Sequence, residues 1–352
     1  MAMVAGLVVA AFASLGPVVG MRSLASLERG AAANAASLLE GRSEASARNR
    51  QGFPFSFLTL HAAAACQRAA YNAPRQICEQ GPSKCDCGED AYFIGVPNSK
   101  TVSVGVADGI GSWRRLGVDA GIFAWELMNK CQEVADHSPQ TSKPEPPLGT
   151  DVVVASDPLK VLRKGYARVW ASAEPPPGSS TACVAQLDRR SGELRVANLG
   201  DSGFMVLRDD KVVAQSTQQQ HSFNHPYQLS VKPDETLGAV TPDNADLYTH
   251  KAAEGDLLIL MTDGILDNLV ADNVVEAVRD LPTRDPHLVA RAVMEAAIAR
   301  STSQVDSPFS IAAREAGHQY PSKGKEDDMT VVVGRVEASE PIEPAPFFFN
   351  DP

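Results

Sequence analysis

The stretch that decides the fold runs from residue 182 to 215 and reads ACVAQLDRRSGELRVANLGDSGFMVLRDDKVVAQ. It holds four apolar segments separated by short polar turns such as Asp188-Arg189-Arg190-Ser191-Gly192 and Arg208-Asp209-Asp210. The segments are Ala182–Leu187, Glu193–Leu199, Gly203–Leu207 and Lys211–Gln215. Turns this short join antiparallel strands, whereas parallel strands need long crossover connections. The stretch therefore predicts an antiparallel sheet and not a doubly wound parallel one.

Further strands and helices are predicted on either side of this stretch. Short β-rich runs predict strands at Thr101–Ala107, Asp256–Met261 and Met329–Val336. Apolar residues at helical spacing predict helices at four places. These are Val118, Ile122, Trp125 and Met128; the segment 159–172; Val275, Val278 and Leu281 after a capping Asp272; and Val289, Val293 and Ala296 after Asp285-Pro286. Antiparallel strands interleaved with paired helices indicate an α+β sandwich with helices covering the sheets.

The bulk composition limits the classes of function. The chain has 352 residues, of which 44% are hydrophobic and 21% charged, as in ordinary soluble globular proteins. Its net charge of -11 argues against nucleic acid as a partner, because phosphates need basic neutralisation. Six cysteines are too few and too irregularly spaced for a disulfide framework, and Cys85-Asp86-Cys87 completes no zinc site. We therefore expect ordinary reduced thiols in a reducing compartment.

The two ends of the chain differ from its middle. Residues 1–20 carry no charge, and residues 22–50 are rich in Arg, Ala and Ser. A secretory signal would begin with basic residues, which are absent here. A membrane anchor is possible in length, but Pro17 and several glycines weaken that interpretation. We favour an organellar transit segment, with membrane association through residues 1–20 as the alternative. We expect residues 1–50 to lie outside the fold and residues 51–87 to be a variable lead-in. The folded domain is expected at residues 88–336, with a surface insertion at 138–158. Residues 337–352 are expected to be a disordered acidic, proline-rich tail.

Five short acidic or glycine-rich clusters are spread along the predicted domain, most of them next to an apolar run. They are Gly88-Glu89-Asp90, Ala107-Asp108-Gly109-Ile110-Gly111, Gly200-Asp201-Ser202, Thr262-Asp263-Gly264 and Asp327-Asp328-Met329-Thr330. Each Asp-Gly pair taken alone is most simply a turn. Carboxylates at strand ends can converge, however, and they then repel one another unless cations lie between them. Together the clusters predict a metal centre with oxygen ligands.

The order and spacing of these clusters resemble the metal-dependent type 2C protein serine/threonine phosphatases. The matching pieces are GEDAYF (88–93), VADGIGSW (106–113), GSSTACV (178–184), ANLGDSGF (197–204), MTDGILDNL (261–269) and EDDMTVVV (326–333). The resemblance covers about residues 88–336. The run QQQHSFNHPYQL (218–229) resembles the mitochondrial, PTC-seven-like branch of that family, which agrees with an organellar N-terminus.

The resemblance implies a four-layer α-β-β-α sandwich of two antiparallel sheets flanked by helices, with two Mn²⁺ or Mg²⁺ ions at one edge. Asp108 would bridge both ions, and Asp263 and Asp327 would hold the first. The Gly109 carbonyl would hold the second, with Glu89 and Asp90 reaching it directly or through water.

Three more residues have supporting roles by the same resemblance. Asp328 stands where many relatives have Asn and would support the ligands, while Thr181 and Asp201 would brace the strands beneath the site. The implied activity is hydrolysis of phosphoserine and phosphothreonine in proteins by a metal-bridging water, without a phosphoenzyme. The implied location is the mitochondrial matrix or inner membrane, with another organelle or an anchored form as the alternative.

The chain departs from the family pattern at three places. Ile110 replaces a histidine that can protonate the leaving group, so His221 or His225 is the candidate substitute. Cys85 stands where the family has a phosphate-binding arginine, which leaves Lys84 as the nearest cation. No acid directly precedes Ser179, where some relatives bind a third metal. Two alternatives therefore stay open: a catalytically weak or silent binding module, and a phosphatase of small phosphorylated metabolites.

Overall fold

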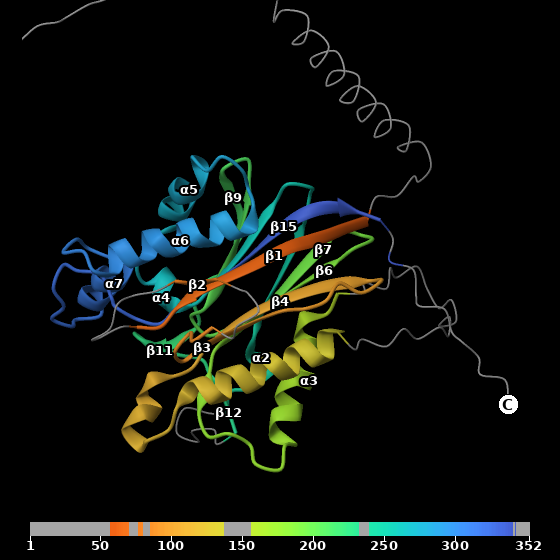
Figure 1. Cartoon of the computed structure of the whole chain (residues 1–352). Helices are drawn as coiled ribbons and strands as arrows, with labels where there is room; N and C mark the ends of the chain where they lie inside the picture. The colour runs from red at the N-terminus through yellow and green to blue at the C-terminus, as the bar shows by residue number, and fades with distance from the viewer. Residues whose placement is uncertain are drawn as a thin grey trace, which may run out of the picture. The chain divides into compact units, whose positions relative to one another are not determined.

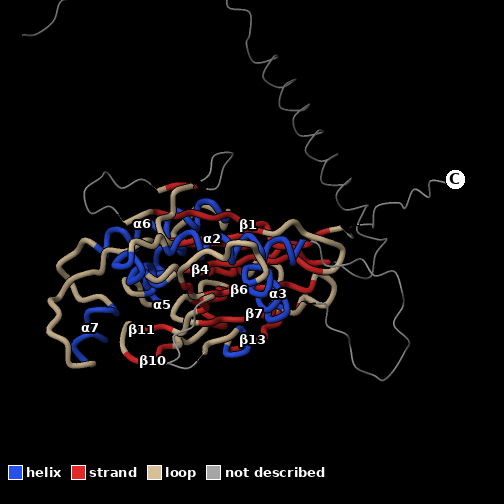
Figure 2. Tube along the Cα trace, turned by 90° about the horizontal axis from the view of Figure 1, so that it is seen from below, coloured by secondary structure: helices blue, strands red, loops and turns tan. Residues whose placement is uncertain are grey.

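Two antiparallel sheets form the centre of the fold in the computed structural model, which describes residues 57–69, 77–79, 85–136, 156–231, 239–340 and 342. The six-stranded sheet has the order β2 (Cys78–Glu79), β1 (Phe57–Gln67), β15 (Met329–Ser339), β14 (Leu257–Met261), β8 (Gly203–Arg208) and β9 (Lys211–Gln215). The five-stranded sheet has the order β13 (Asp246–Lys251), β7 (Glu193–Leu199), β6 (Ala182–Asp188), β4 (Thr101–Asp108) and β3 (Asp90–Ile94). Figure 2 shows β4, β6, β7 and β13 following one another in this order.

Helices cover the outer face of each sheet (Figure 1). Helices α5 (Ala271–Arg279) and α6 (Pro286–Ser301) share an apolar cluster with the six-stranded sheet. Helices α2 (Ala120–Asp136) and α3 (Pro158–Trp170) share another with the five-stranded sheet. The smaller elements are η2 (Gly111–Leu116), η3 (Pro242–Asn244), α4 (Asp263–Leu266), α7 (Pro308–Glu315) and the short pairs β10 (Gln220–Ser222) with β11 (His225–Pro226) and β5 (Ser179–Ser180) with β12 (Leu229–Ser230).

Strand alternation explains why the two sheets stack. Along β14, Leu258 and Leu260 point into the cluster between the sheets, while Ile259 points into the cluster under the helices. Successive side chains of a strand leave opposite faces, so a strand that is apolar throughout must be covered on both sides. The predicted α+β class and the four-layer sandwich implied by the resemblance are confirmed.

The strands of the deciding stretch are those predicted, each to within one residue. The structure adds β1, a long strand between β2 and β15 in the six-stranded sheet, in the segment that the sequence assigned to a variable lead-in. Its residues pair with β15 from Phe57 opposite Ser339 to Gln67 opposite Met329. The strand β15 also runs to Ser339, so residues 337–339 belong to the sheet and not to the predicted tail.

Two helix predictions need correction. In α2 the buried face is formed by Phe123, Leu127 and Met128, whereas the predicted Ile122 is 57% exposed. The helix α5 begins after Val270, so Asp272 lies in its first turn and does not cap it. The N-cap of α6 at Asp285 is confirmed, since its carboxylate accepts hydrogen bonds from two backbone amides of the first turn.

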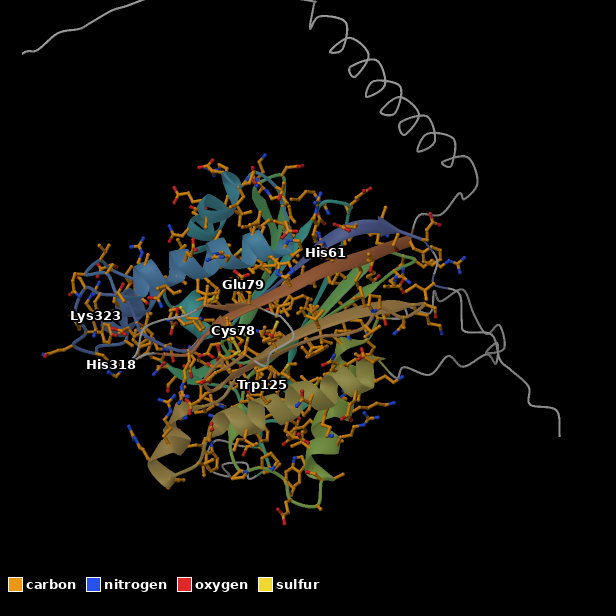
Figure 3. All side chains as sticks on the ribbon, viewed as in Figure 1. His61, Cys78, Glu79, Trp125, His318 and Lys323 are labelled. Carbon is orange, nitrogen blue, oxygen red and sulfur yellow. A yellow bond between two sulfur atoms is a disulfide. The ribbon has the colours of Figure 1, made fainter. Side chains whose placement is uncertain are left out.

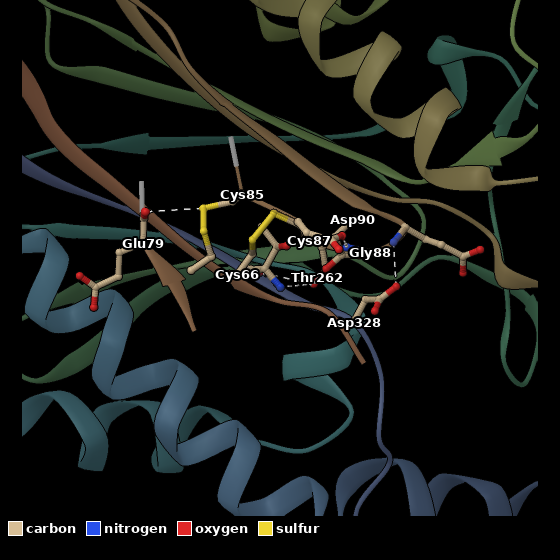
Figure 4. Close-up of a disulfide and its surroundings, with 12 residues drawn as sticks. Cys66, Glu79, Cys85, Cys87, Gly88, Asp90, Thr262 and Asp328 are labelled. Atoms are coloured by element: carbon tan, nitrogen blue, oxygen red, sulfur yellow. Dashed lines mark hydrogen bonds between the residues drawn. A yellow bond between two sulfur atoms is a disulfide. The ribbon is translucent and has the colours of Figure 1, made fainter. Parts of the chain in front are cut away.

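The expectation of reduced thiols is wrong for four of the six cysteines. Cys66 is disulfide-bonded to Cys87, and Cys78 is bonded to Cys85 (Figure 4). Spacing along the chain could not show these pairs, because strand β1 brings Cys66 beside the segment that leads into β3. Cys131 and Cys183 are free and buried.

Several predictions fall outside the described residues: the transit segment 1–50, nearly all of the 138–158 insertion, residue Lys84, and the tail from 343 onward. Among the described helices, none has the length and apolar character needed to cross a bilayer.

Candidate metal centre

Asp108 stands at the end of β4, where the backbone on both sides of it is fixed. Its amide donates to the hydroxyl of Thr181 at 3.0 Å, and the amide of Thr181 donates to the carbonyl of Asp108 at 3.0 Å. The Thr181 hydroxyl also lies 2.7 Å from that of Ser202. These bonds connect the end of β4 to the β7–β8 turn. The bracing role expected of Thr181 stays a prediction.

Asp90 lies directly opposite Asp108 in the pairing of β3 with β4. It is fully buried, and its Oδ2 accepts a hydrogen bond of 2.8 Å from the hydroxyl of Thr262 (Figure 4). The same hydroxyl accepts from the amide of Thr330 at 2.9 Å, so Thr262 connects the two sheets at this edge. No described group donates a hydrogen bond to the other oxygen of Asp90, Oδ1.

Asp263 follows strand β14 as the first residue of helix α4. Gly264 follows it, and the backbone of Asp328 passes so close to this position that only a glycine fits. A Cβ at Gly264 would lie 2.0 Å from the backbone oxygen of Asp328, so no side chain fits there unless the backbone moves. This close approach places Asp263 beside the residues that lead into β15.

Carboxylate oxygens of Asp108, Asp201 and Asp263 all lie within 4.8 Å of one another. A bracing role was expected for Asp201 from the sequence, whereas in the structure its carboxylate belongs to this cluster. Burial and then repulsion from Asp263 raise the pKa of Asp108 well above its usual value. Burial, followed by the same repulsion, raises the pKa of Asp201 to about 7.

This oxygen-only donor set fits a hard divalent cation. Mg²⁺ and Mn²⁺ take carboxylate and carbonyl ligands, and a cation at this point would offset the mutual repulsion of the acids. The Oδ1 atom of Asp201 has no hydrogen-bond partner among the described residues although it is buried, as is expected of a ligand oxygen.

A lysine that the sequence reasoning missed lies against the cluster. The Lys325 ammonium is 2.9 Å from Asp263 Oδ2, 2.9 Å from Asp327 Oδ2 and 2.5 Å from Asp267 Oδ2. Burial alone would raise the pKa of Asp263, but the charge and hydrogen bond of Lys325 hold that pKa below its usual value. Burial raises the pKa of Asp327 to about 6, helped by repulsion from Asp263 and opposed by Lys325.

Glu89 is held by an arginine instead of standing free in the cavity. Its two carboxylate oxygens lie 2.9 Å from Arg114 Nε and 2.8 Å from Arg114 Nη2. The backbone amide of Glu89 donates to Asp328 Oδ2 at 2.7 Å, and the amide of Ala69 donates to Asp328 Oδ1. Asp328 therefore anchors the backbone of Glu89. Its expected role in supporting the metal ligands stays a prediction.

Gly109 has no room for a side chain. A Cβ there would lie 2.7 Å from the backbone oxygens of both Ala120 and Glu89. Its amide donates to the Glu89 carbonyl at 3.1 Å, which holds the strand end close to the start of β3. The absence of a side chain at Gly109 thus allows the backbone at Gly109, Glu89 and Ala120 to pack closely together beside the acids.

A cavity of about 560 Å³ opens over these groups. Its described lining includes five acids, Glu89, Asp108, Asp201, Asp263 and Asp327, two cations, Arg114 and Lys325, and the β10–β11 hairpin with Phe223 and His225. His221 is not among the lining residues, and its ring stacks on that of Tyr227 with centroids 4.3 Å apart. The structure therefore places His225, and not His221, at the cavity.

An aromatic group stands beside this hairpin. The Phe223 ring lies 5.1 Å from that of Phe309 and 5.3 Å from that of His318, and Tyr320 packs on Phe309 at 5.2 Å. Figure 3 shows the labelled His318 near Lys323 at the end of the molecule that carries α7. Of these residues, Phe223 belongs to the cavity lining.

The comparisons with known proteins agree with this geometry. Residues 98–337 match the family described as Stage II sporulation protein E (SpoIIE). The chain is 38% identical to the protein phosphatase PTC7 homolog fig of Drosophila mojavensis over 261 residues, which is 72% of this chain and 79% of that protein. It is also 38% identical to the Drosophila melanogaster protein of the same name over 257 residues, or 71% of this chain and 77% of that one. The chain belongs to the type 2C protein phosphatase family.

A solved structure extends the similarity to three dimensions. The photosystem II phosphatase PBCP matches this type 2C phosphatase with a TM-score of 0.62 and 27% identity, over 79% of this chain and 98% of that chain. The family resemblance read from the acidic clusters is confirmed, as is the PTC7-like branch.

The sequence reasoning missed Asp267, Lys325 and Arg114. A signal existed for Asp267, which follows Asp263 by one helical turn, so both side chains leave the same face. Arg114 lies in the short helix η2, which directly follows the Asp108 cluster. Lys325 has no local signal, because only the approach of α4 to the start of β15 makes its position special.

Proposed function

We propose that this phosphatase hydrolyses phosphoserine and phosphothreonine in proteins with two Mn²⁺ or Mg²⁺ ions. The observation that carries the proposal is the convergence of Asp108, Asp201 and Asp263 on one point at the base of a cavity. Membership of the type 2C family supports the reaction class. The cavity is open enough, and polar enough, for a phosphorylated side chain to enter.

In this proposal Asp108, Asp263 and Asp327 would be ligands of the ions, and Asp201 is close enough to contribute. The Gly109 carbonyl and Asp90 would also serve as ligands, and Glu89 would contribute through water. Bound ions would activate a bridging water for attack at phosphorus and offset charge on the phosphoryl oxygens. No Ser, Cys or Asp nucleophile is required, so no phosphoenzyme forms.

The remaining residues keep these groups in place. Lys325 joins Asp263 to Asp327, and its own backbone is fixed by Asn268, which both donates to and accepts from Lys325. Thr262 and Asp328 hold the backbone at the start of β3 and β15. With Ile110 unable to transfer a proton, we propose that His225 or a water in the cavity supplies the proton for the leaving oxygen.

The location of the protein is part of the proposal. The PTC7-like resemblance favours mitochondria. The two disulfides favour an oxidising compartment over a reducing one, because thiol pools keep cysteines reduced in the cytosol. We therefore place the protein in a mitochondrial compartment that permits disulfides, in preference to the matrix.

A substrate survey tests the proposal. The full chain is assayed with Mn²⁺, with Mg²⁺ and without metal on phosphothreonine and phosphoserine peptides and on a panel of small phosphorylated metabolites. We expect metal-dependent turnover with kcat/KM higher for the peptides. Acid quenching with ³²P-labelled peptide should leave no label on the protein. Preference for a metabolite, or a labelled phosphoenzyme, would contradict the proposal.

A further inference from the structure

The metal cavity has a strong excess of negative charge. Its described lining includes five carboxylates and two basic side chains, Arg114 and Lys325. A phosphate monoester is a dianion near neutral pH, so it needs a positive group that it can reach. Cations bound by the acids would supply part of that charge, and the protein must supply the rest.

The two basic side chains are placed very differently. Lys325 is 16% exposed, and its ammonium contacts three carboxylates within 2.9 Å. Arg114 is 51% exposed at the cavity, whereas its partner Glu89 is 10% exposed. An anion arriving from solvent can therefore reach the guanidinium of Arg114, while the ammonium of Lys325 is occupied by its three carboxylate contacts.

Arg114 is also oriented in advance. Glu89 grips the guanidinium along one edge through Nε and Nη2, and Asp328 lies 3.7 Å from Nη2. A planar guanidinium held along one edge has a fixed direction, which lowers the entropy lost when it binds a second oxyanion. Arg114 lies in the short helix η2, six positions after Asp108 of the acidic cluster.

We infer that Arg114 binds the phosphoryl group of the substrate, with Glu89 as the group that holds its guanidinium in position. The inference rests on the proposed phosphatase function and deepens it. It replaces Lys84, the cation that the sequence suggested for this purpose.

The test is direct binding of inorganic phosphate to the full chain in the presence of Mg²⁺, measured by calorimetry, with Mg²⁺ affinity measured separately. Arg114→Lys keeps the charge beside Glu89 and removes the fork, and Arg114→Met removes both. Arg115→Met is the matched control, because Arg115 is the next residue of the same helix, is exposed and is not among the cavity lining.

We expect phosphate affinity to fall on the order of tenfold for Arg114→Lys and a hundredfold for Arg114→Met, since a hydrogen bond to a charged group is worth about that much. The Mg²⁺ affinity of Arg114→Lys should stay within about twofold of the wild type, and Arg115→Met should match the wild type in both. On active enzyme the Lys variant should raise KM and the inhibition constant of phosphate together.

The opposite pattern would overturn the inference. If phosphate affinity is unchanged in both Arg114 variants while Mg²⁺ affinity falls, Arg114 acts only by positioning Glu89. If the wild type binds no phosphate, the assignment is also wrong. Because binding is measured without turnover, a wild type that binds phosphate through Arg114 yet hydrolyses no phosphoester would refute the proposed function and leave this inference standing.

Discussion

The Cys66–Cys87 disulfide connects strand β1 to the residues just before Glu89 and Asp90. Its two cysteines are 21 positions apart in sequence, and both are buried. Cys66 pairs with Thr330 of β15, beside Asp328. We predict that the double variant Cys66→Ala/Cys87→Ala lowers the free energy of unfolding substantially, because the unfolded chain regains the freedom that the crosslink removes.

The size of the effect follows from the length of the closed loop. Chain entropy gives a stabilisation of about 3 kcal/mol for a loop of this length. The shorter Cys78–Cys85 loop, with a separation of 7, gives about 2 kcal/mol by the same relation and provides the matched control. Urea unfolding of the full chain, without reductant, should show these losses in the two double variants.

Two results would refute this reasoning. One is a loss below about 1 kcal/mol for Cys66→Ala/Cys87→Ala, since the loop term alone exceeds that value. The other is a thiol titration of the wild type in denaturant, without reductant, that finds all six cysteines reduced. Two reactive thiols are expected in that titration.

Three further predictions concern the site and the core. Asp108→Asn should raise the stability of the metal-free protein, because it relieves the repulsion between carboxylates. It should also abolish the increase in Tm that Mn²⁺ gives the wild type, and an unchanged Mn²⁺-induced Tm shift would argue against this site. Gly264→Ala should cost about 1–3 kcal/mol in urea unfolding, because its Cβ would meet the Asp328 carbonyl, and a neutral result would contradict that contact. Cys131 and Cys183 should resist alkylation in the native protein, because burial raises the pKa of the Cys131 thiol to about 12 and also raises the pKa of the Cys183 thiol. Rapid labelling detected by mass spectrometry would contradict this prediction and show that these sites open.

The sequence predicted most strands of the fold because their signals are local. Segments such as Glu193–Leu199 begin with alternating polar and apolar residues and lie between short polar turns, and no long-range information is needed to recognise them. Strand β1 was missed for the opposite reason. Its centre, Ala62–Ala65, is a run of alanines, which favours helix in isolation and becomes a strand because small side chains fit against the valines of β15.

The candidate site divides in the same way. The acidic clusters could be found because each stands beside an apolar strand, and their order matches a family. The partners of these acids could not be found, since Lys325 and Arg114 acquire their positions only when distant segments meet. The helix α2 shows a third kind of limit: Ile122 and Phe123 are both apolar, and only packing on the sheet decides which one is buried.

The most direct test of the central claim is Mn²⁺-dependent hydrolysis of a phosphothreonine peptide by the full chain, beside Asp263→Asn. The variant removes one charge from the acidic cluster and keeps the size of the side chain. The account predicts that wild-type turnover requires Mn²⁺ and that the variant, while folded, loses on the order of a hundredfold or more in activity, together with its Mn²⁺ affinity. Metal-independent turnover, or full activity in Asp263→Asn, would contradict the account.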